Sequence, residues 1–307
     1  MATSILPRED ELEDLVPREG SILWRKAGDS RILSGAGYAL LLQVSHPTVG
    51  AGVDQHSDFA ADPWGRLLRT LDYVHGTVYG GPRLAGEIGR RVRNLHKDIK
   101  GSKPDGQPYH ALEPEAYAWV HATLASSIVD GHRLLGAALS PAEAEDFWQE
   151  WRRLGRLVGV RYGDLPEHWA GFRPYFDRVV EEELEDTRMV HVVFDTLAEP
   201  APPEIPGLHP ALWKALRHPM GRSMQLVTAG LLPPVLRERF GFEWTLGQER
   251  MLRVLSRASR ASGPLMRGPL RQFGPYYVRW RRAALERGDV ASSHIAAKLR
   301  AKAHGAA

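Results

Sequence analysis

The amino-acid sequence predicts an all-α protein with a single multi-helix domain. Apolar residues recur at the three- and four-residue spacing of helices in segment after segment. Helix start and stop signals bracket these segments, and no run alternates between apolar and polar residues as a half-buried strand does. With 307 residues, of which 43% are hydrophobic and 25% charged, the chain can bury one large core or two modest ones.

The helices are predicted mainly from their ends. Asp62 followed by Pro63 is an N-cap with proline at the first helical position, so a helix is expected over 64–79, ending before Gly80. Ser140 and Glu143 form a capping box that starts another helix. The same kinds of signal predict helices over 82–100, 114–138, 166–184, 187–198, 209–218, 222–231, 246–262 and 267–287.

The proline-rich segment 199–208 is the only plausible internal boundary. We interpret it as a loop within one domain, because the helices before it are too few to close a core. The expected organisation is an N-terminal extension over 1–30, one helical domain over 31–290 and a tail over 291–307.

Composition excludes several classes of function. The chain has no cysteine, which removes disulfides, thiolate ligands and the covalent CxxCH haem link, so any metal must be held by His, carboxylate, Tyr or Met. The 40 basic residues nearly cancel the 37 acidic ones, which gives nucleic-acid binding no support. The acidic N-terminus lacks a signal-peptide pattern, and no apolar stretch is long enough to span a bilayer. A cytoplasmic protein without an integral membrane segment is expected.

Common catalytic motifs are missing. Gly35 and Gly37 lack the third glycine of a dinucleotide fingerprint, and HExxH, GxSxG and the P-loop do not occur. The acidic run 181–186 lacks the ExxH pairs of a di-iron bundle and is typical of a solvated helix end.

Two predicted helices carry unusual polar residues. In 64–79, one face holds Arg66, Thr70, Tyr73 and Thr77. That face either lines a polar pocket or meets solvent. In 82–100, His96 lies at the margin of the apolar stripe on the same side as Gly89, where a flat group would have room. The alternative is a half-buried histidine satisfied by a backbone carbonyl.

Three further histidines stand out. His121 lies on a helix of small and apolar residues, where it is either a ligand or, more often, a hydrogen-bond hub. His46 and His56 are ten residues apart in QVSHPTVGAGVDQHSDF and look like a metal pair, but Pro47 and the glycines leave their relative geometry undefined. We interpret this stretch as a pocket wall that supplies a base, with His46, Asp54 and His56 as candidates.

Taken together, the motifs ALLLQVSHPTVGAGVDQHSDFAADPWGRLLRTLDYVHGTVYG, RRVRNLHKDIKG and YHALEPEAYAWVHATLASS resemble the MpaB-type oxygenase and rubber oxygenase (latex clearing protein) catalytic-domain family. The resemblance is dense from about 31 to 162 and continues more weakly to PYYVRW. It implies a helical, globin-like core holding a non-covalent haem b, and an O2-dependent cleavage of carbon–carbon double bonds in isoprenoid chains.

By position, the resemblance makes His96 the proximal iron ligand and places Arg66 and Thr70 in the haem pocket. His121 is added as a candidate cofactor-binding residue because of its place on an apolar helix. The rubber-cleaving branch has a distal lysine ligand where this chain has Arg69, whose guanidinium has no lone pair for a metal. An open or water-bound sixth site is therefore expected, with Arg66, Arg69 and Thr70 as oxygen-stabilising groups. The expected substrate is a small hydrophobic alkene rather than polymeric rubber.

Two alternatives remain at this point. The chain is a haem-binding or small-ligand-binding protein without oxygenase turnover, or a metal-free helical binding protein whose histidines are all structural. Haem analysis of the purified protein distinguishes a metal-free binding protein from the haem proteins. Product formation distinguishes an oxygenase from a haem-binding protein without turnover.

Overall fold

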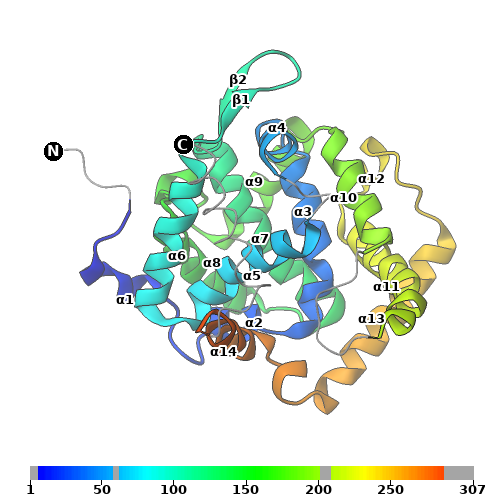
Figure 1. The fold of residues 1–307 in the computed structure, drawn as a ribbon. Coiled ribbons are helices and arrows are strands. Elements are labelled where there is room, and N and C mark those ends of the chain that lie inside the picture. Colours follow the sequence, from blue (N-terminus) through cyan, green and yellow to red (C-terminus); the bar gives the residue numbers. More distant parts are fainter. Residues whose placement is uncertain (1–5, 58–61, 201–208, 287–307) are drawn as a thin grey trace.

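The computed structural model describes residues 6–57, 62–200 and 209–286 and confirms the all-α class (Figure 1). The helices and two short strands in this part of the chain are α1 (Leu12–Leu15), α2 (Ile22–Ala27), α3 (Ala36–Val44), α4 (Pro47–His56), α5 (Pro63–Tyr79), α6 (Gly81–His96), β1 (Lys100–Ser102), β2 (Pro108–His110), α7 (Pro114–Leu135), α8 (Pro141–Gly155), α9 (Trp169–Glu182), α10 (Arg188–Ala198), α11 (Pro210–Leu231), α12 (Pro234–Arg239), α13 (Leu246–Ser262) and α14 (Phe273–Glu286).

The predicted capping signals work as expected. The Asp62 carboxylate accepts a hydrogen bond from the Gly65 amide at 2.9 Å and starts α5. At the start of α8, the Ser140 hydroxyl and the Glu143 carboxylate each accept from the other residue's amide. Each cap satisfies amide groups that a helix start would otherwise leave unpaired.

Two local predictions were wrong. The loop after α6 is a β-hairpin, in which β1 pairs antiparallel with β2, and α6 therefore ends at His96 rather than at residue 100. The two helices predicted over 209–218 and 222–231 are one helix, α11, with Pro219 inside it. Pro47 lies where α3 and α4 are separated and occupies the first position of α4.

Helices α3 and α7 form the centre of the core, and α8, α10 and α11 pack on them (Figure 1). Small residues on α7, including Ala118, Ala122 and Ala125, are fully buried and let neighbouring helices approach closely. The Trp119 indole nitrogen donates to the Leu42 carbonyl at 2.8 Å, so the contact of α7 with α3 is also fixed by a buried hydrogen bond.

Residues assigned to the N-terminal extension contribute to the same core. Leu12 of α1 and Leu23 of α2 are buried in the central apolar cluster. Most of the predicted loop 199–208 and all of the predicted tail 291–307 lie outside the described residues.

Helix α14 packs on α5 through a charged and aromatic contact. The Arg281 guanidinium makes a two-point ion pair with the Asp72 carboxylate, with N–O distances of 2.8 and 2.9 Å. The Tyr277 hydroxyl donates to the same carboxylate at 2.6 Å. Beside this group, His75 is 2% exposed and is enclosed by the rings of Tyr79, Phe273 and Tyr277.

Neither ring nitrogen of His75 has a hydrogen-bond partner among the described residues. Burial lowers the pKa of this imidazole to about 4, although the nearby Asp72 carboxylate acts in the opposite direction. The ring is therefore neutral in the folded protein, while the unfolded chain has an ordinary histidine pKa near 6.5. Between these two values the unfolded state binds more protons, so His75 makes the fold less stable as pH falls from 6.5 to 4.

We predict that His75→Phe stabilises the protein at pH 7 by about 1–2 kcal/mol, because it fills the aromatic cage and removes two unpaired buried nitrogens. Between pH 7 and pH 4, His75 should lower the free energy of unfolding of the natural protein by roughly 3 kcal/mol, and this decrease should be missing in the variant. Urea unfolding at both pH values measures these effects. His75→Ala is the control and should be destabilised by a cavity at both pH values. A His75→Phe variant with the same acid dependence as the natural protein would contradict the interpretation.

Candidate functional site

The polar face of α5 lies against the protein and becomes fully buried toward the end of the helix. Thr77 is fully buried, and its hydroxyl donates to the Tyr73 carbonyl at 2.7 Å. Tyr73 itself reaches α7, where its hydroxyl lies 2.9 Å from the Nδ1 atom of His121. Because Arg66 and Thr70 share this face, the rotation that buries Thr77 also turns them inward.

His121 connects α5, α7 and α8. Its Nε2 donates to the Trp151 carbonyl at 2.9 Å, which leaves Nδ1 as the acceptor for the Tyr73 hydroxyl. The Trp151 indole in turn donates to the His121 carbonyl at 3.0 Å, and the two rings stack with centroids 4.8 Å apart. Burial lowers the pKa of His121 to about 4, so the ring is neutral. Both nitrogens are used within the protein, and neither is available as an iron ligand.

Arg66 is an arginine in an unusually dry setting. Burial lowers the pKa of its guanidinium to about 10, and the neighbouring Arg69 charge contributes to the same shift. Its side chain donates to the Ser57 hydroxyl at 3.2 Å, and no carboxylate among the described residues forms an ion pair with it. A half-buried cation of this kind is suited to an anionic group supplied by a ligand.

His96 ends α6 close to Arg66. Its Nδ1 donates to the Val92 carbonyl at 2.7 Å, which fixes the tautomer and leaves the Nε2 lone pair free. Burial lowers the pKa of the imidazole, and the Arg66 charge lowers it further, so the ring is neutral near pH 7. A neutral imidazole with one nitrogen held by a carbonyl is the usual state of a histidine metal ligand.

The residues around His96 explain how it is positioned. The Tyr117 ring of α7 packs edge-on against the imidazole with centroids 5.7 Å apart. The β1–β2 hairpin fixes the end of α6, because the His110 imidazole bonds the Lys97 carbonyl at 3.0 Å. Val92 is half-buried and Leu95 is exposed on the same turns, so apolar surface adjoins the ligand candidate.

The predicted role of Gly89 was wrong. A Cβ atom at this position would lie 2.0 Å from the Leu157 carbonyl oxygen. The glycine therefore admits the backbone of a neighbouring segment, and this close approach leaves no room there for a flat ligand.

Arg69 and Thr70 make contacts within α5 and its cap. An Arg69 guanidinium nitrogen lies 3.6 Å from the Asp62 carboxylate, and the Thr70 hydroxyl donates to the Arg66 carbonyl at 3.2 Å. Asp62 therefore both caps α5 and draws the Arg69 charge toward the helix start.

The three candidate bases lie at different places along α4. His46 precedes the helix and is buried, with Nε2 3.7 Å from the Glu183 carboxylate. Asp54 is ion-paired with Arg188. His56 ends the helix, and its Nε2 lies 3.1 Å from the Lys100 carbonyl. The structure thus separates His46 from His56 by the length of α4 and does not bring them together as a metal pair.

A cavity of about 1000 Å³ opens beside His46, and it holds no other predicted site residue. Its wall carries carboxylates from Glu113, Glu182 and Glu183. Within the described part of the chain, no three His, Asp or Glu side chains are grouped so that they could hold a metal ion.

The residues at the end of α6 and the start of α5 fit a haem group. His96 offers one free imidazole nitrogen, Arg66 offers a half-buried cation for a propionate, and the exposed Leu95 offers apolar contact. Sequence reasoning missed Tyr117, Ser57 and the hairpin, which support this site. Their roles depend on contacts between distant segments and leave no local pattern.

Comparison with known proteins identifies the family of the chain. Residues 24–261 match the family described as ER-bound oxygenase mpaB/B'/Rubber oxygenase, catalytic domain. Two relatives, Uncharacterized protein Rv2237 of Mycobacterium tuberculosis and Uncharacterized protein Mb2261 of Mycobacterium bovis, are each 25% identical over 229 residues, which cover 72% of this chain and 86% of theirs. No solved structure matches the chain. With more than two thirds of its length matched, the chain belongs to the MpaB and rubber oxygenase catalytic-domain family.

Proposed function

We propose that this protein is a haem b-dependent oxygenase that uses O2 to cleave a carbon–carbon double bond in a hydrophobic, isoprenoid-like substrate. The observation that carries the proposal is the free Nε2 of His96 beside the half-buried Arg66 cation, in a chain of an oxygenase family. The globin-like character of the core belongs to the same proposal.

The bound haem would supply the iron that activates dioxygen. His96 would hold the group through Nε2, while the Val92 carbonyl keeps the imidazole neutral and oriented. Arg66 would pair with an anionic group of the cofactor or stabilise negative charge developing on oxygen, and burial would strengthen either interaction. Arg69 and Thr70 lie on the next turn and would add positive charge and a hydroxyl.

His56 is the best placed of the three candidate bases. It adjoins Ser57, whose hydroxyl contacts Arg66, and its Nδ1 has no hydrogen-bond partner among the described residues. That nitrogen could accept an allylic proton from the alkene and return it as the two carbonyl products form. Asp54 is already neutralised by Arg188, and His46 faces a different cavity.

The structure also bears on the rival functions. Both nitrogens of His121 are engaged within the protein, so a metal-free role is well supported for that residue but not for His96. A haem-binding protein without turnover would share His96 with an oxygenase. Product formation from an isoprenoid alkene under O2 separates these two functions.

We predict that the purified protein binds haem with a Soret absorption band and that His96→Ala lowers haem affinity at least about 100-fold, because the iron loses its protein ligand. Titration with haem followed by absorption spectroscopy measures this. His191→Ala is the matched control, since His191 is an exposed histidine paired with Asp186 on the surface. If His96→Ala keeps the full affinity, the iron ligand lies elsewhere; if the natural protein shows no Soret band, the cofactor assignment fails.

We further predict that Arg66→Ala retains the Soret band at saturating haem but slows O2-dependent turnover roughly 100-fold or more, because a preorganised cation is lost from a dry site. Arg66→Lys should restore part of the rate, since it keeps the charge without the planar fork. Turnover is followed by the carbonyl products of an isoprenoid alkene. Equal rates for Arg66→Ala and the natural protein would remove Arg66 from the chemistry.

A further inference from the structure

The C-terminal part of the described chain exposes large apolar side chains to an unusual extent. Leu265 is 82% exposed, Leu246 75% and Leu270 68%, which are the highest values among the large hydrophobic residues that the structure describes. Met251 and Val254 on α13 are also exposed. Exposed apolar side chains gathered in one stretch of the chain point to an interaction site when they share one surface.

The outward face of α13 is divided lengthwise into a cationic half and an apolar half. At 100° per residue, Leu252 and Ser256 define the buried side. The exposed side carries one stripe of arginines and, beside it, one stripe of apolar or small residues: Arg250, Arg253, Arg257 and Arg260 in the first, and Gly247, Met251, Val254, Ala258 and Ala261 in the second.

The chain continues from α13 into two Gly-Pro-Leu turns, Gly263–Leu265 and Gly268–Leu270, which are both 3-10 helices. Each turn ends on one of the exposed leucines, and an arginine follows it closely. The Arg267 side chain donates to the Pro264 carbonyl at 2.7 Å, so this arginine braces its own turn. The turns thus present leucine side chains on a short, proline-stiffened backbone.

Positive charge is concentrated in the same region. Residues 246–286 contain nine arginines and two glutamates, a net charge of +7, while the whole chain has +3. The remainder of the chain must therefore carry −4. The near-balance of the full sequence hides this cluster, so composition alone was a poor guide to a local basic field.

Most of these charges are not neutralised within the protein. In the described residues, Arg253 pairs with Glu249 and Arg281 with Asp72. No carboxylate there lies within ion-pair distance of the others: Arg250, Arg257, Arg260, Arg267, Arg271, Arg279 and Arg282.

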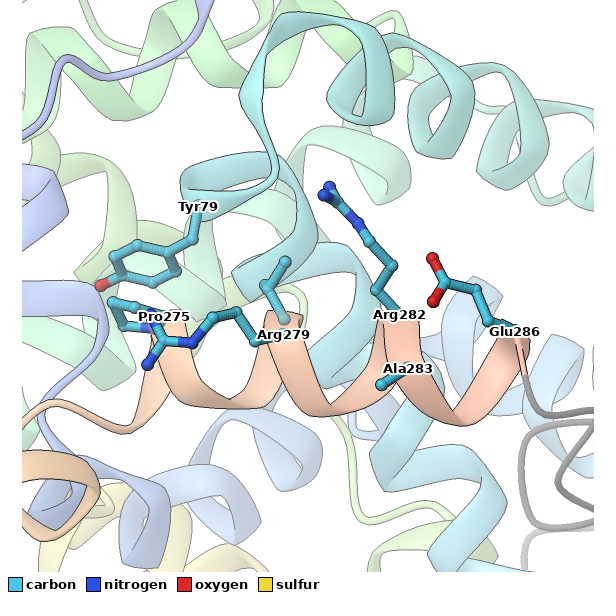
Figure 2. A pocket seen from close by; sticks show the side chains of 7 residues that line it. Tyr79, Pro275, Arg279, Arg282, Ala283 and Glu286 are labelled. Atoms are coloured by element: carbon cyan, nitrogen blue, oxygen red, sulfur yellow. The ribbon is translucent and has the colours of Figure 1, made fainter.

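Helix α14 extends the surface beyond the second turn. The Tyr276 ring lies beside Gly268, and the Arg279 guanidinium lies 4.4 Å from the centre of that ring. Figure 2 shows Arg279 and Arg282 on α14 at a hollow of about 270 Å³ that Tyr79 helps to line. Along the lower edge of Figure 1, α13, the two turns and α14 follow one another.

We propose that the surface formed by α13, the two Gly-Pro-Leu turns and the start of α14 docks on a membrane that contains anionic lipid. The arginines would attract the negative headgroups, and Leu265, Leu270 and the apolar stripe of α13 would enter the headgroup boundary. Nucleic acid would bind the same arginines, but its binding would not account for the exposed leucines. A second protein copy would have to pair this cationic surface with itself, which like charge opposes.

The test is co-sedimentation of the full chain with vesicles of phosphatidylcholine alone or mixed with phosphatidylglycerol. Binding is expected only to the anionic vesicles. Replacing Arg250 and Arg257 with Gln should weaken partitioning roughly 30-fold, and replacing Leu265 and Leu270 with Ser roughly tenfold or more. Arg90→Gln with Arg91→Gln makes the same charge change on the exposed side of α6 and should alter binding less than about twofold.

Several outcomes would overturn the proposal. One is failure of the natural protein to bind anionic vesicles, and another is equal loss in the α6 control. Binding that the leucine variant leaves unchanged would exclude apolar insertion. Tighter binding to duplex DNA than to vesicles, or a dimer in light scattering that the leucine variant dissolves, would assign the surface to another partner. Circular dichroism spectra that match the natural protein would show that the variants are folded.

Discussion

The buried imidazole of His121 is the contact on which the arrangement of the candidate site depends. It accepts a hydrogen bond from Tyr73 on α5, donates one to α8 and stacks on Trp151. Because these bonds are directional, α5 can take only one rotation relative to α7 and α8. Arg66 lies two turns before Tyr73 on the same face, so its inward orientation follows from a contact that takes no part in the proposed chemistry.

Much of the fold could be predicted because helix ends are encoded locally. Asp62, Ser140 and Glu143 cap helices by contacts within four residues, and such signals survive in a single sequence. The hairpin after α6 was missed because three-residue strands are too short to show alternation. Position on a helix face found His96 and Arg66, and the family resemblance supplied their roles. Gly89, by contrast, was misjudged because its neighbour is 68 residues away in the chain.

The setting of His75 could not be predicted from the sequence. Nothing around it in the sequence distinguishes it from the other histidines, since the rings that enclose it come largely from α14, about 200 residues later. Helix α14 has two kinds of contact surface. It covers the outer face of α5 through Arg281 and Tyr277, and its own outer residues continue the cationic surface. A perturbation of that surface can therefore reach the helix that carries Arg66 through the ion pair of Arg281 with Asp72.

Burial changes along α5 in a way that bears on how a bulky group could enter the site. Residues 62–73 are all half-buried, whereas 74–78 are fully buried. The free energy of local opening should rise along the helix in the same direction, since buried packing is what a fluctuation must disrupt. Helix α5 is therefore held firmly by packing at its C-terminal end, and its N-terminal end near Arg66 should open more easily. Loading of a planar cofactor would then require bending of one helix end and not separation of the core.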